Sequence, residues 1–202
     1  MNGIIIHGVR NTIESPRKGR TDYELWTSSS GMEMWDYALQ DWTRHFDCHN
    51  IEPQHGHLGI KLARGSAWSY YKKVGPERII YGWETHPEVP AMRVYPLEAV
   101  YAAVPEARGR LGQTMDLMMA LAVAEGRPHI VLNGVGLVGD DAHPTDHRWQ
   151  ALHKSLLFWI GFCAGRGIKV SFEGHSVFGP LVGVYGQQGF VKEASQSTQK
   201  EG

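Results

Sequence analysis

Six polar residues stand where short apolar stretches of this chain end: His7, Thr27, Ser28, His49, Asn133 and Glu173. An imidazole or a carboxylate can act as a general base, so His49 and Glu173 are the candidate catalytic residues. If the apolar stretches are parallel strands, their carboxyl ends meet at one edge of the sheet, where such sheets bind nucleotide-sized ligands. We therefore expect these side chains to line a ligand site, with the other four as binding residues.

The residues next to these strand ends complete the predicted ligand-binding set: Gly8, Arg10, Gln113, Thr114, Gly134 and Gly136. A simpler interpretation applies to each polar residue taken singly, because side chains at strand ends often satisfy backbone groups of the adjoining loops. The prediction of a ligand site therefore rests on the polar residues taken together, and not on any one of them.

Known catalytic motifs are absent from the sequence. His55 and His57 form one close histidine pair, and His143 and His147 form another that straddles Pro144, so the second pair cannot share a regular helical face. A metal centre needs three or four converging ligands, and we expect none here. The chain also lacks GxSxG, Walker A and complete GxGxxG sequences, so no cofactor is assigned.

The stretch from Gly112 to Gly136 is the unit that must position much of this edge. Gly112-Gln113-Thr114 opens a helix that is apolar on nearly every side from Met115 to Glu125, and Gly126 with Pro128 ends it. Residues 129–135 then form an apolar strand. A helix that is apolar all round is buried, and a strand with successive apolar residues suits a parallel sheet covered on both faces.

The remaining apolar segments alternate between strand and helix patterns. The predicted strands are 3–9, 23–28, 44–50, 78–82, 92–95, 129–135 and 168–172, and the predicted helices begin near Ser30 and cover 67–74, 96–104, 115–125 and 149–163. The connections include loops at 53–59, 139–147 and 176–189. This alternation indicates one α/β domain over 1–190 with a parallel sheet covered on both faces, followed by a polar tail at 191–202.

Composition narrows the classes of function. The chain has 202 residues, of which 42% are hydrophobic and 20% charged, and its net charge of -1 argues against a dedicated duplex-binding protein. Two isolated cysteines form no disulfide framework, and Cys48 and Cys163 are expected to be buried thiols because both stand in apolar surroundings. The start MNGIIIHGV is not a signal peptide, and no apolar run is long enough to span a membrane. We expect a cytoplasmic protein, and a homo-oligomer is compatible with the sequence.

Four segments in order resemble a group of bacteriophage-encoded Rossmann-like proteins, which are related in pattern to the motility-associated-factor and sialyltransferase-like glycosyltransferases. They are RHFDCH (44–49), HPEVPAMRVYPLEAV (86–100), MMALAVAEGRPHIVLNGVGL (118–137) and FWIGFCAGRGIKVSFEGHS (158–176). The resemblance implies an α/β Rossmann-like three-layer sandwich with a mostly parallel central sheet. It also implies a pocket for a nucleotide or a nucleotide-sugar.

The chain departs from this group at three places. HGVRNTIES stands where the group has a glycine-rich loop, Gly112-Gln113-Thr114 replaces paired serines, and Gly136 replaces an acidic residue. The missing acidic group argues against metal-linked or ribose-linked catalysis more than against binding. Three functions stay open: a glycosyltransferase-like enzyme, a non-catalytic protein that sequesters a nucleotide-derived immune signal as an anti-defence factor, and a structural phage protein.

Overall fold

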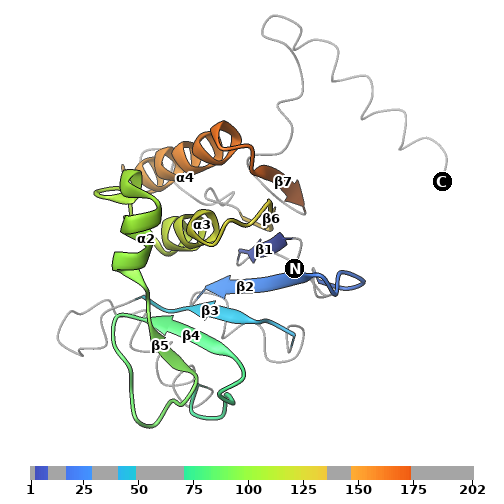
Figure 1. Cartoon of the computed structure of the whole chain (residues 1–202), viewed down its shortest axis with the longest axis vertical. Coiled ribbons are helices and arrows are strands. Elements are labelled where there is room, and N and C mark those ends of the chain that lie inside the picture. The colour runs from blue at the N-terminus through green and yellow to red at the C-terminus, as the bar shows by residue number, and fades with distance from the viewer. Residues whose placement is uncertain (1–2, 9–16, 29–40, 49–70, 136–146, 174–202) are drawn as a thin grey trace, which may run out of the picture.

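Seven parallel strands form one sheet in the computed structural model, which describes residues 3–8, 17–28, 41–48, 71–135 and 147–173 (Figure 1). The strands are β1 (Gly3–His7), β2 (Tyr23–Ser28), β3 (Arg44–Phe46), β4 (Ile79–Gly82), β5 (Met92–Val94), β6 (His129–Asn133) and β7 (Lys169–Glu173). Their order across the sheet is β5-β4-β3-β2-β1-β6-β7, and each neighbouring pair is parallel. The predicted α/β class is therefore confirmed.

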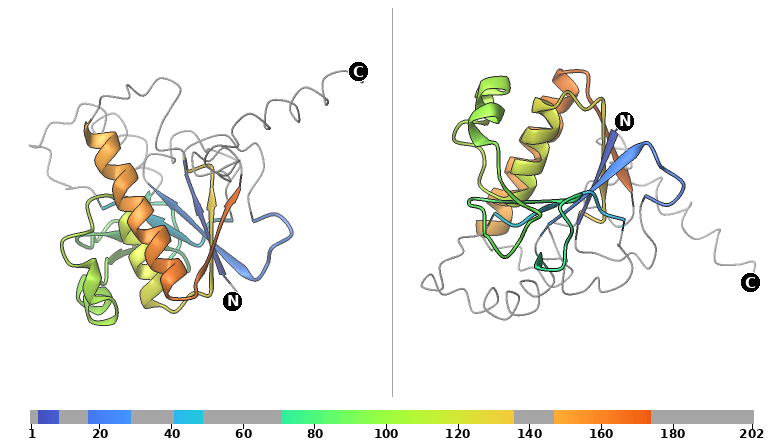
Figure 2. Two further views of the ribbon diagram at one scale, coloured as in Figure 1. Left: turned by 90° about the horizontal axis from the view of Figure 1, so that it is seen from above. Right: turned by 60° about the horizontal axis from the view of Figure 1, so that its bottom comes forward.

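Helices cover one face of this sheet (Figure 2). They are α2 (Leu97–Ala103), the short 3-10 helix η2 (Pro105–Ala107), α3 (Thr114–Ala124) and α4 (His147–Gly165). Every residue of α3 from Asp116 to Val123 is buried. Its apolar side chains share one core with Ile4 and Ile6 of β1 and with Trp159 of α4. The prediction that α3 is buried on all sides is confirmed, because α2, α4 and the sheet surround it.

The opposite face carries a second, smaller core. Ile5, Leu25 and Val131 point to this side and belong to the same apolar cluster as Trp42 and Tyr71, which come from the connections of the first half of the chain. Right-handed crossovers explain the division. From β1 to β5 the chain moves toward one edge of the sheet, and then it crosses back to β6 and β7, so the later connections lie on the other face.

β1 and β6 form the switch point of the sheet, because the chain adds β2 to β5 on one side of β1 and then adds β6 and β7 on the other. β1 pairs with β2 on one side and with β6 on the other, although β1 ends at residue 7 and β6 begins at residue 129. Loops that leave two such strands turn to opposite sides and open a crevice at the carboxyl edge, which is the common ligand position in open α/β sheets. The position of β6 next to the edge strand β7 was not evident from its apolar sequence.

The two long helices on the covered face end in the same way. Gly126 after α3 and Gly167 after α4 adopt φ values of 68° and 73°, in the left-handed region that favours glycine. Beyond each glycine, the next backbone N–H reaches back to the helix: Arg127 donates to Ala122, and Ile168 donates to Cys163. This Schellman pattern turns the chain directly into β6 and β7.

Several predicted boundaries differ from the structure. β1, β3 and β6 end at His7, Phe46 and Asn133, earlier than the sequence pattern predicts, and η2 was not predicted. Residue 71 is helical, as expected for the 67–74 helix. Outside the described residues lie the helix predicted from Ser30, the loops at 53–59 and 176–189, most of the 139–147 connection, and the tail at 191–202.

Candidate ligand site at the carboxyl edge of the sheet

Five polar residues occupy one register row across five neighbouring strands. His7 of β1 pairs with Thr27 of β2 and with Asn133 of β6, and the row continues to His45 of β3 and Glu173 of β7. Residues paired in a parallel sheet point to the same face, so these side chains share the face opposite the helices. The row contains four of the six residues that the sequence places at this edge.

His7 and Asn133 face each other across the switch point. The Nδ1 atom of His7 lies 2.7 Å from the side-chain oxygen of Asn133, and the two residues are only 2% and 6% exposed. Because the amide oxygen accepts this bond, Nδ1 carries the proton of the neutral imidazole. Burial lowers the pKa of His7 to about 4, against an opposing effect of the bonds to Asn133. His7 is therefore neutral at pH 7.

Two glycines allow the backbones to approach closely beside this pair. A Cβ atom on Gly8 would overlap the carbonyl oxygen of Gly134 and would lie 2.8 Å from the Cα atom of Val135. Gly134 itself has a φ of 59°, and its N–H donates to the carbonyl of Glu173. The predicted ligand-binding residues Gly8 and Gly134 thus have a structural role at the switch point, and their role toward a ligand stays a prediction.

A directed chain of hydrogen bonds begins at Thr27, one strand away. Tyr71 donates its hydroxyl proton to the carboxylate of Asp47 (3.0 Å), so its oxygen accepts from Nε2 of His45 (2.9 Å). In a neutral imidazole, Nδ1 of His45 is then the acceptor for the hydroxyl of Thr27 (2.9 Å). The proton of each donor is thereby assigned along the whole chain, from Thr27 to Asp47.

His45, Tyr71 and Asp47 were not among the predicted site residues. His45 is fully buried, and its ring centroid lies 6.0 Å from that of Trp42 and 5.5 Å from that of Tyr71. Its place in RHFD shows only that it points away from Arg44 and Phe46. Strand register was needed to show that this histidine stands beside Thr27.

The predicted general base Glu173 forms an ion pair. Its two carboxylate oxygens accept hydrogen bonds from the two terminal nitrogens of Arg20, at 2.8 and 3.0 Å. The pair joins β7 to the turn that precedes β2. The guanidinium occupies one lone pair on each carboxylate oxygen, and the catalytic role of Glu173 stays a prediction.

Gln113 and Thr114 begin α3 on the helix-covered side of the same edge. The carboxylate of Asp116 accepts from the backbone N–H groups of Gly112 (3.0 Å) and Gln113 (3.1 Å) and from the side-chain amide of Gln113 (3.3 Å). Burial raises the pKa of Asp116, while these bonds and one from Ser155 oppose that effect. An internal carboxylate therefore accepts from the backbone N–H groups of the two residues that precede this helix.

The other predicted site residues do not join the row of polar side chains. Ser28 pairs in register with Phe46, which belongs to the helix-side core, so Ser28 and Thr27 point to opposite faces. His49, Arg10 and Gly136 lie outside the described residues, as do His55, His57 and His143. The described residues contain no group of three or more side chains suited to hold a metal ion.

A second polar cluster lies nearer the amino ends of the strands on the same face. His129 of β6 is 2.7 Å from the hydroxyl of Tyr23 through Nδ1 and 2.8 Å from the hydroxyl of Ser171 through Nε2. Tyr23 belongs to β2, so its ring must cross β1 to reach β6. Gly3 of β1 makes this crossing possible, because a Cβ atom there would lie 2.5 Å from the ring.

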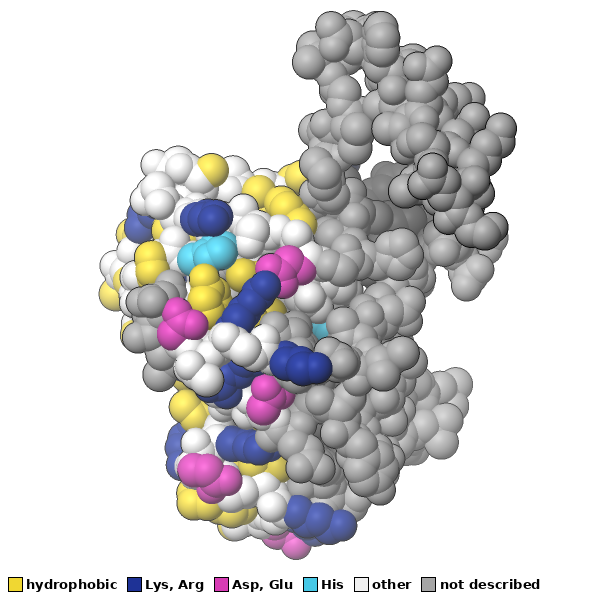
Figure 3. Space-filling view, turned by 90° about the vertical axis from the view of Figure 1, so that its right-hand side faces the viewer, with side chains coloured by type: hydrophobic (Ala, Val, Ile, Leu, Met, Phe, Trp, Pro, Cys, Tyr) yellow, Lys and Arg dark blue, Asp and Glu magenta, His cyan; other side chains and the backbone are white. Residues whose placement is uncertain are grey.

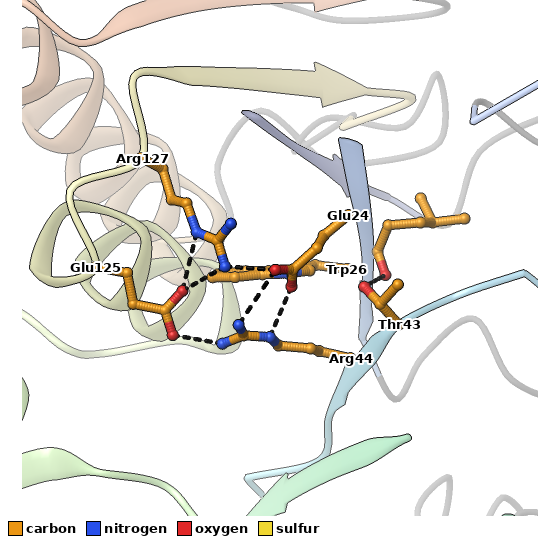
Figure 4. A network of polar contacts seen from close by, with 7 residues as sticks. Glu24, Trp26, Thr43, Arg44, Glu125 and Arg127 are labelled. Carbon is orange, nitrogen blue, oxygen red and sulfur yellow. Dashed lines mark hydrogen bonds and ion pairs between the residues drawn. The ribbon is translucent and has the colours of Figure 1, made fainter. Parts of the chain in front are cut away.

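Four charged residues form an alternating network on the helix-covered face (Figure 4). Glu24 bonds to both Arg44 and Arg127, and Glu125 at the end of α3 bonds to the same two guanidinium groups. Trp26 donates its indole N–H to Glu24 (2.8 Å). Burial alone would raise the pKa of Glu24, but the indole and both arginines outweigh it and hold that pKa below its ordinary value. This network joins β2 and β3 to the turn between α3 and β6.

Cys163 is buried, as expected, whereas Cys48 is only partly buried. Burial raises the pKa of the Cys48 thiol to about 12 and that of Cys163 to about 11, which disfavours the reactive thiolate. Among the described residues on the face drawn in Figure 3, basic and acidic side chains are interspersed and neither sign forms a continuous patch. No helix in the described ranges is long and apolar enough to cross a membrane.

The fold and the row of polar side chains define the class of protein: a doubly wound, all-parallel α/β domain with a polar switch point. Comparison with known proteins adds no narrower family. The chain matches no protein-family model, no curated protein and no solved structure.

Proposed function

We propose that this protein binds a nucleotide-type small molecule, such as a nucleotide or a nucleotide-sugar, at the carboxyl edge of its sheet. The observation that carries the proposal is the His7–Asn133 pair, which stands at the reversal point between β1 and β6. Open parallel sheets bind ligands at this point because the loops diverge there. The buried pair supplies fixed polar groups at this edge, as small-molecule sites commonly do.

The nucleotide class of the ligand comes from the resemblance of the chain to Rossmann-like phage proteins. Within the segment 118–137, which carries part of that resemblance, lie β6 and the glycine that follows Asn133. The segment 158–176 includes β7, whose last residue, Glu173, belongs to the polar row. Two of the resembling segments thus supply the side of the proposed site that lies beyond β1.

The state of His7 supports a role in holding the ligand. A general base works best with a pKa near the working pH, and burial places the pKa of His7 at about 4. A neutral imidazole fixed by Asn133 is instead suited to hydrogen bonding in one orientation. The proposal is therefore a binding function first, with transfer of a sugar from a nucleotide-sugar as the reaction class if the ligand is consumed.

The test is a ligand search with a matched pair of variants. Small molecules released by denaturation of the purified protein are identified by mass spectrometry, and thermal stability is measured with nucleotides and nucleotide-sugars. A ligand that binds only the folded state at 100 times its Kd adds about 2.7 kcal/mol of stability. Asn133→Ala should abolish this gain. Ser171→Ala, which changes the same face one row lower, should retain it.

Two outcomes separate the remaining alternatives. A ligand recovered intact favours a protein that sequesters a nucleotide-derived signal, whereas a ligand recovered only as cleaved products favours a glycosyltransferase-like enzyme that loses activity in His49→Ala. If no nucleotide or nucleotide-sugar stabilises the protein and none is released from it, the proposed function is wrong and a structural role becomes the better explanation.

A further inference from the structure

We propose that the Thr27 hydroxyl is a nucleophile, activated by a relay through His45, Tyr71 and Asp47, which reacts with an activated phosphoryl or acyl group. The proposal rests on the proposed function for the place of the ligand, but the geometry of the relay is independent of it. None of these four residues belongs to the His7–Asn133 pair.

The directions of the hydrogen bonds carry the inference. Asp47 can only accept, so the proton of Tyr71 points to Asp47 and the proton of His45 is on Nε2. The unprotonated Nδ1 of His45 therefore faces Thr27 at 2.9 Å. A hydroxyl within hydrogen-bond reach of a base, which is itself oriented by a third group, is the arrangement that activates serine and threonine nucleophiles.

The proton balance of the reaction follows from this arrangement. As the Oγ1 atom of Thr27 forms a bond to phosphorus or carbon, its proton moves to Nδ1 of His45. The bond to the leaving group breaks, and the electron pair leaves with that group. Asp47 offsets the positive charge on the imidazolium through the hydroxyl of Tyr71. His45 then returns the proton to the leaving group. In a second displacement, His45 takes a proton from water as the water oxygen bonds to phosphorus or carbon, and the Oγ1 atom of Thr27 leaves and receives that proton.

Two other hydroxyl groups show why Thr27 is singled out. Thr43 donates its hydroxyl proton to the carbonyl of Leu25 (2.9 Å), which cannot serve as a base. Ser171 lies 2.8 Å from His129, but the third group there is the hydroxyl of Tyr23. A hydroxyl can donate or accept, so the proton direction at Ser171 is not determined. Only the chain from Thr27 ends in a carboxylate among these three.

The first part of the test uses diisopropyl fluorophosphate on the full-length protein. We expect one diisopropylphosphoryl adduct, located on Thr27 by peptide mass spectrometry, because the Oγ1–P bond forms as fluoride leaves. Thr43 of the same molecules is the internal control and should stay unmodified. An adduct on Ser171 with none on Thr27, or no adduct on Thr27 at all, would overturn the proposal.

Variants separate activation by the relay from the intrinsic reactivity of the hydroxyl of Thr27, a residue that is only 3% exposed. His45→Gln should slow the labelling of Thr27 by about 100-fold, the lower end of the range for a general base. Tyr71→Phe should slow it by a smaller factor, whereas Thr43→Val should leave it unchanged. Equal labelling rates in His45→Gln and the unaltered protein would show that His45 activates nothing.

The relay can also be checked without a chemical probe. Long-range ¹⁵N–¹H NMR spectra of the histidine rings should show His45 with its proton on Nε2, and Tyr71→Phe should alter this signal while the protein stays folded by circular dichroism. A proton on Nδ1 of His45 would exclude the proposed direction. Labelling of Thr27 without stabilisation by nucleotides would keep the relay and reject the nucleotide ligand, so the two proposals fail separately.

Discussion

The imidazole of His7 and the amide of Asn133 lie 2.7 Å apart, although 126 positions separate them in the chain. Their strands are neighbours only because the chain crosses back over the sheet after β5. Register then places both side chains on one face at the same level. The hydrogen bond therefore depends on the topology of the whole sheet, and four measurements would test the consequences of this architecture.

The first prediction concerns the acid stability of the protein. Unfolded His7 takes up a proton near pH 6.5, whereas folded His7 does so only near pH 4. As the pH falls through this window, the unfolded state binds the proton and the folded state does not, so stability is lost. The difference between these two pKa values corresponds to a change of about 3 kcal/mol in the free energy of unfolding. Urea denaturation should show that the free energy of unfolding falls between pH 7 and pH 4. In His7→Asn this fall should be smaller by about the same amount. An equal loss in both proteins would contradict it.

The second prediction concerns the charge at position 133. Asn133→Asp replaces the neutral acceptor of His7 by a carboxylate at the same place, and a negative neighbour favours the imidazolium. The pKa of His7 in this variant, measured by NMR titration of its ring, should rise clearly above the value of about 4 in the unaltered protein. Asn133→Leu keeps the volume without the charge and should give no such rise. A similar pKa in all three proteins would disprove the contact.

The third prediction concerns the buried charge network. The Glu24 side chain is 7% exposed and bonds to two arginines that are themselves 14% and 12% exposed. Removing one partner leaves a buried charge poorly compensated, so Glu24→Gln should lower the free energy of unfolding by about 3 kcal/mol. Arg166→Met, which breaks an exposed pair with Glu106, should cost less than about 1 kcal/mol. Chemical denaturation measures the free energy of unfolding of both variants, and equal losses in the two would contradict the prediction.

The fourth prediction concerns Gly3. A methyl group there would lie 2.5 Å from the Tyr23 ring and 2.8 Å from the carbonyl oxygen of His129, so Gly3→Ala should destabilise the protein by about 1–3 kcal/mol. Gly161→Ala is the matched control, because a Cβ atom on this exposed α4 glycine meets nothing within 4 Å. It should stabilise the protein by about 0.5–1 kcal/mol. Thermal melts that moved in the same direction would refute the crowding at Gly3.

The local sequence predicts much of the fold. The runs around Ile5 and Val131 are apolar at successive positions, which is typical of strands covered on both faces, and both are buried in the sheet. The apolar α3 and the glycines that end the helices were also predictable, because packing on all sides and left-handed φ values restrict the residue types. Strand lengths were overestimated at β3, since apolar alternation continues after the pairing stops at Phe46.

The sequence by itself determined that polar residues end the strands, and hence that His7, Thr27, Asn133 and Glu173 lie at one edge. Strand order and register decided the rest. They placed β6 beside β1, set His45 next to Thr27, turned Ser28 to the other face and paired Glu173 with Arg20. The physical reason is that a strand pattern specifies which residues alternate, whereas the neighbours of each residue depend on strands far away in the chain.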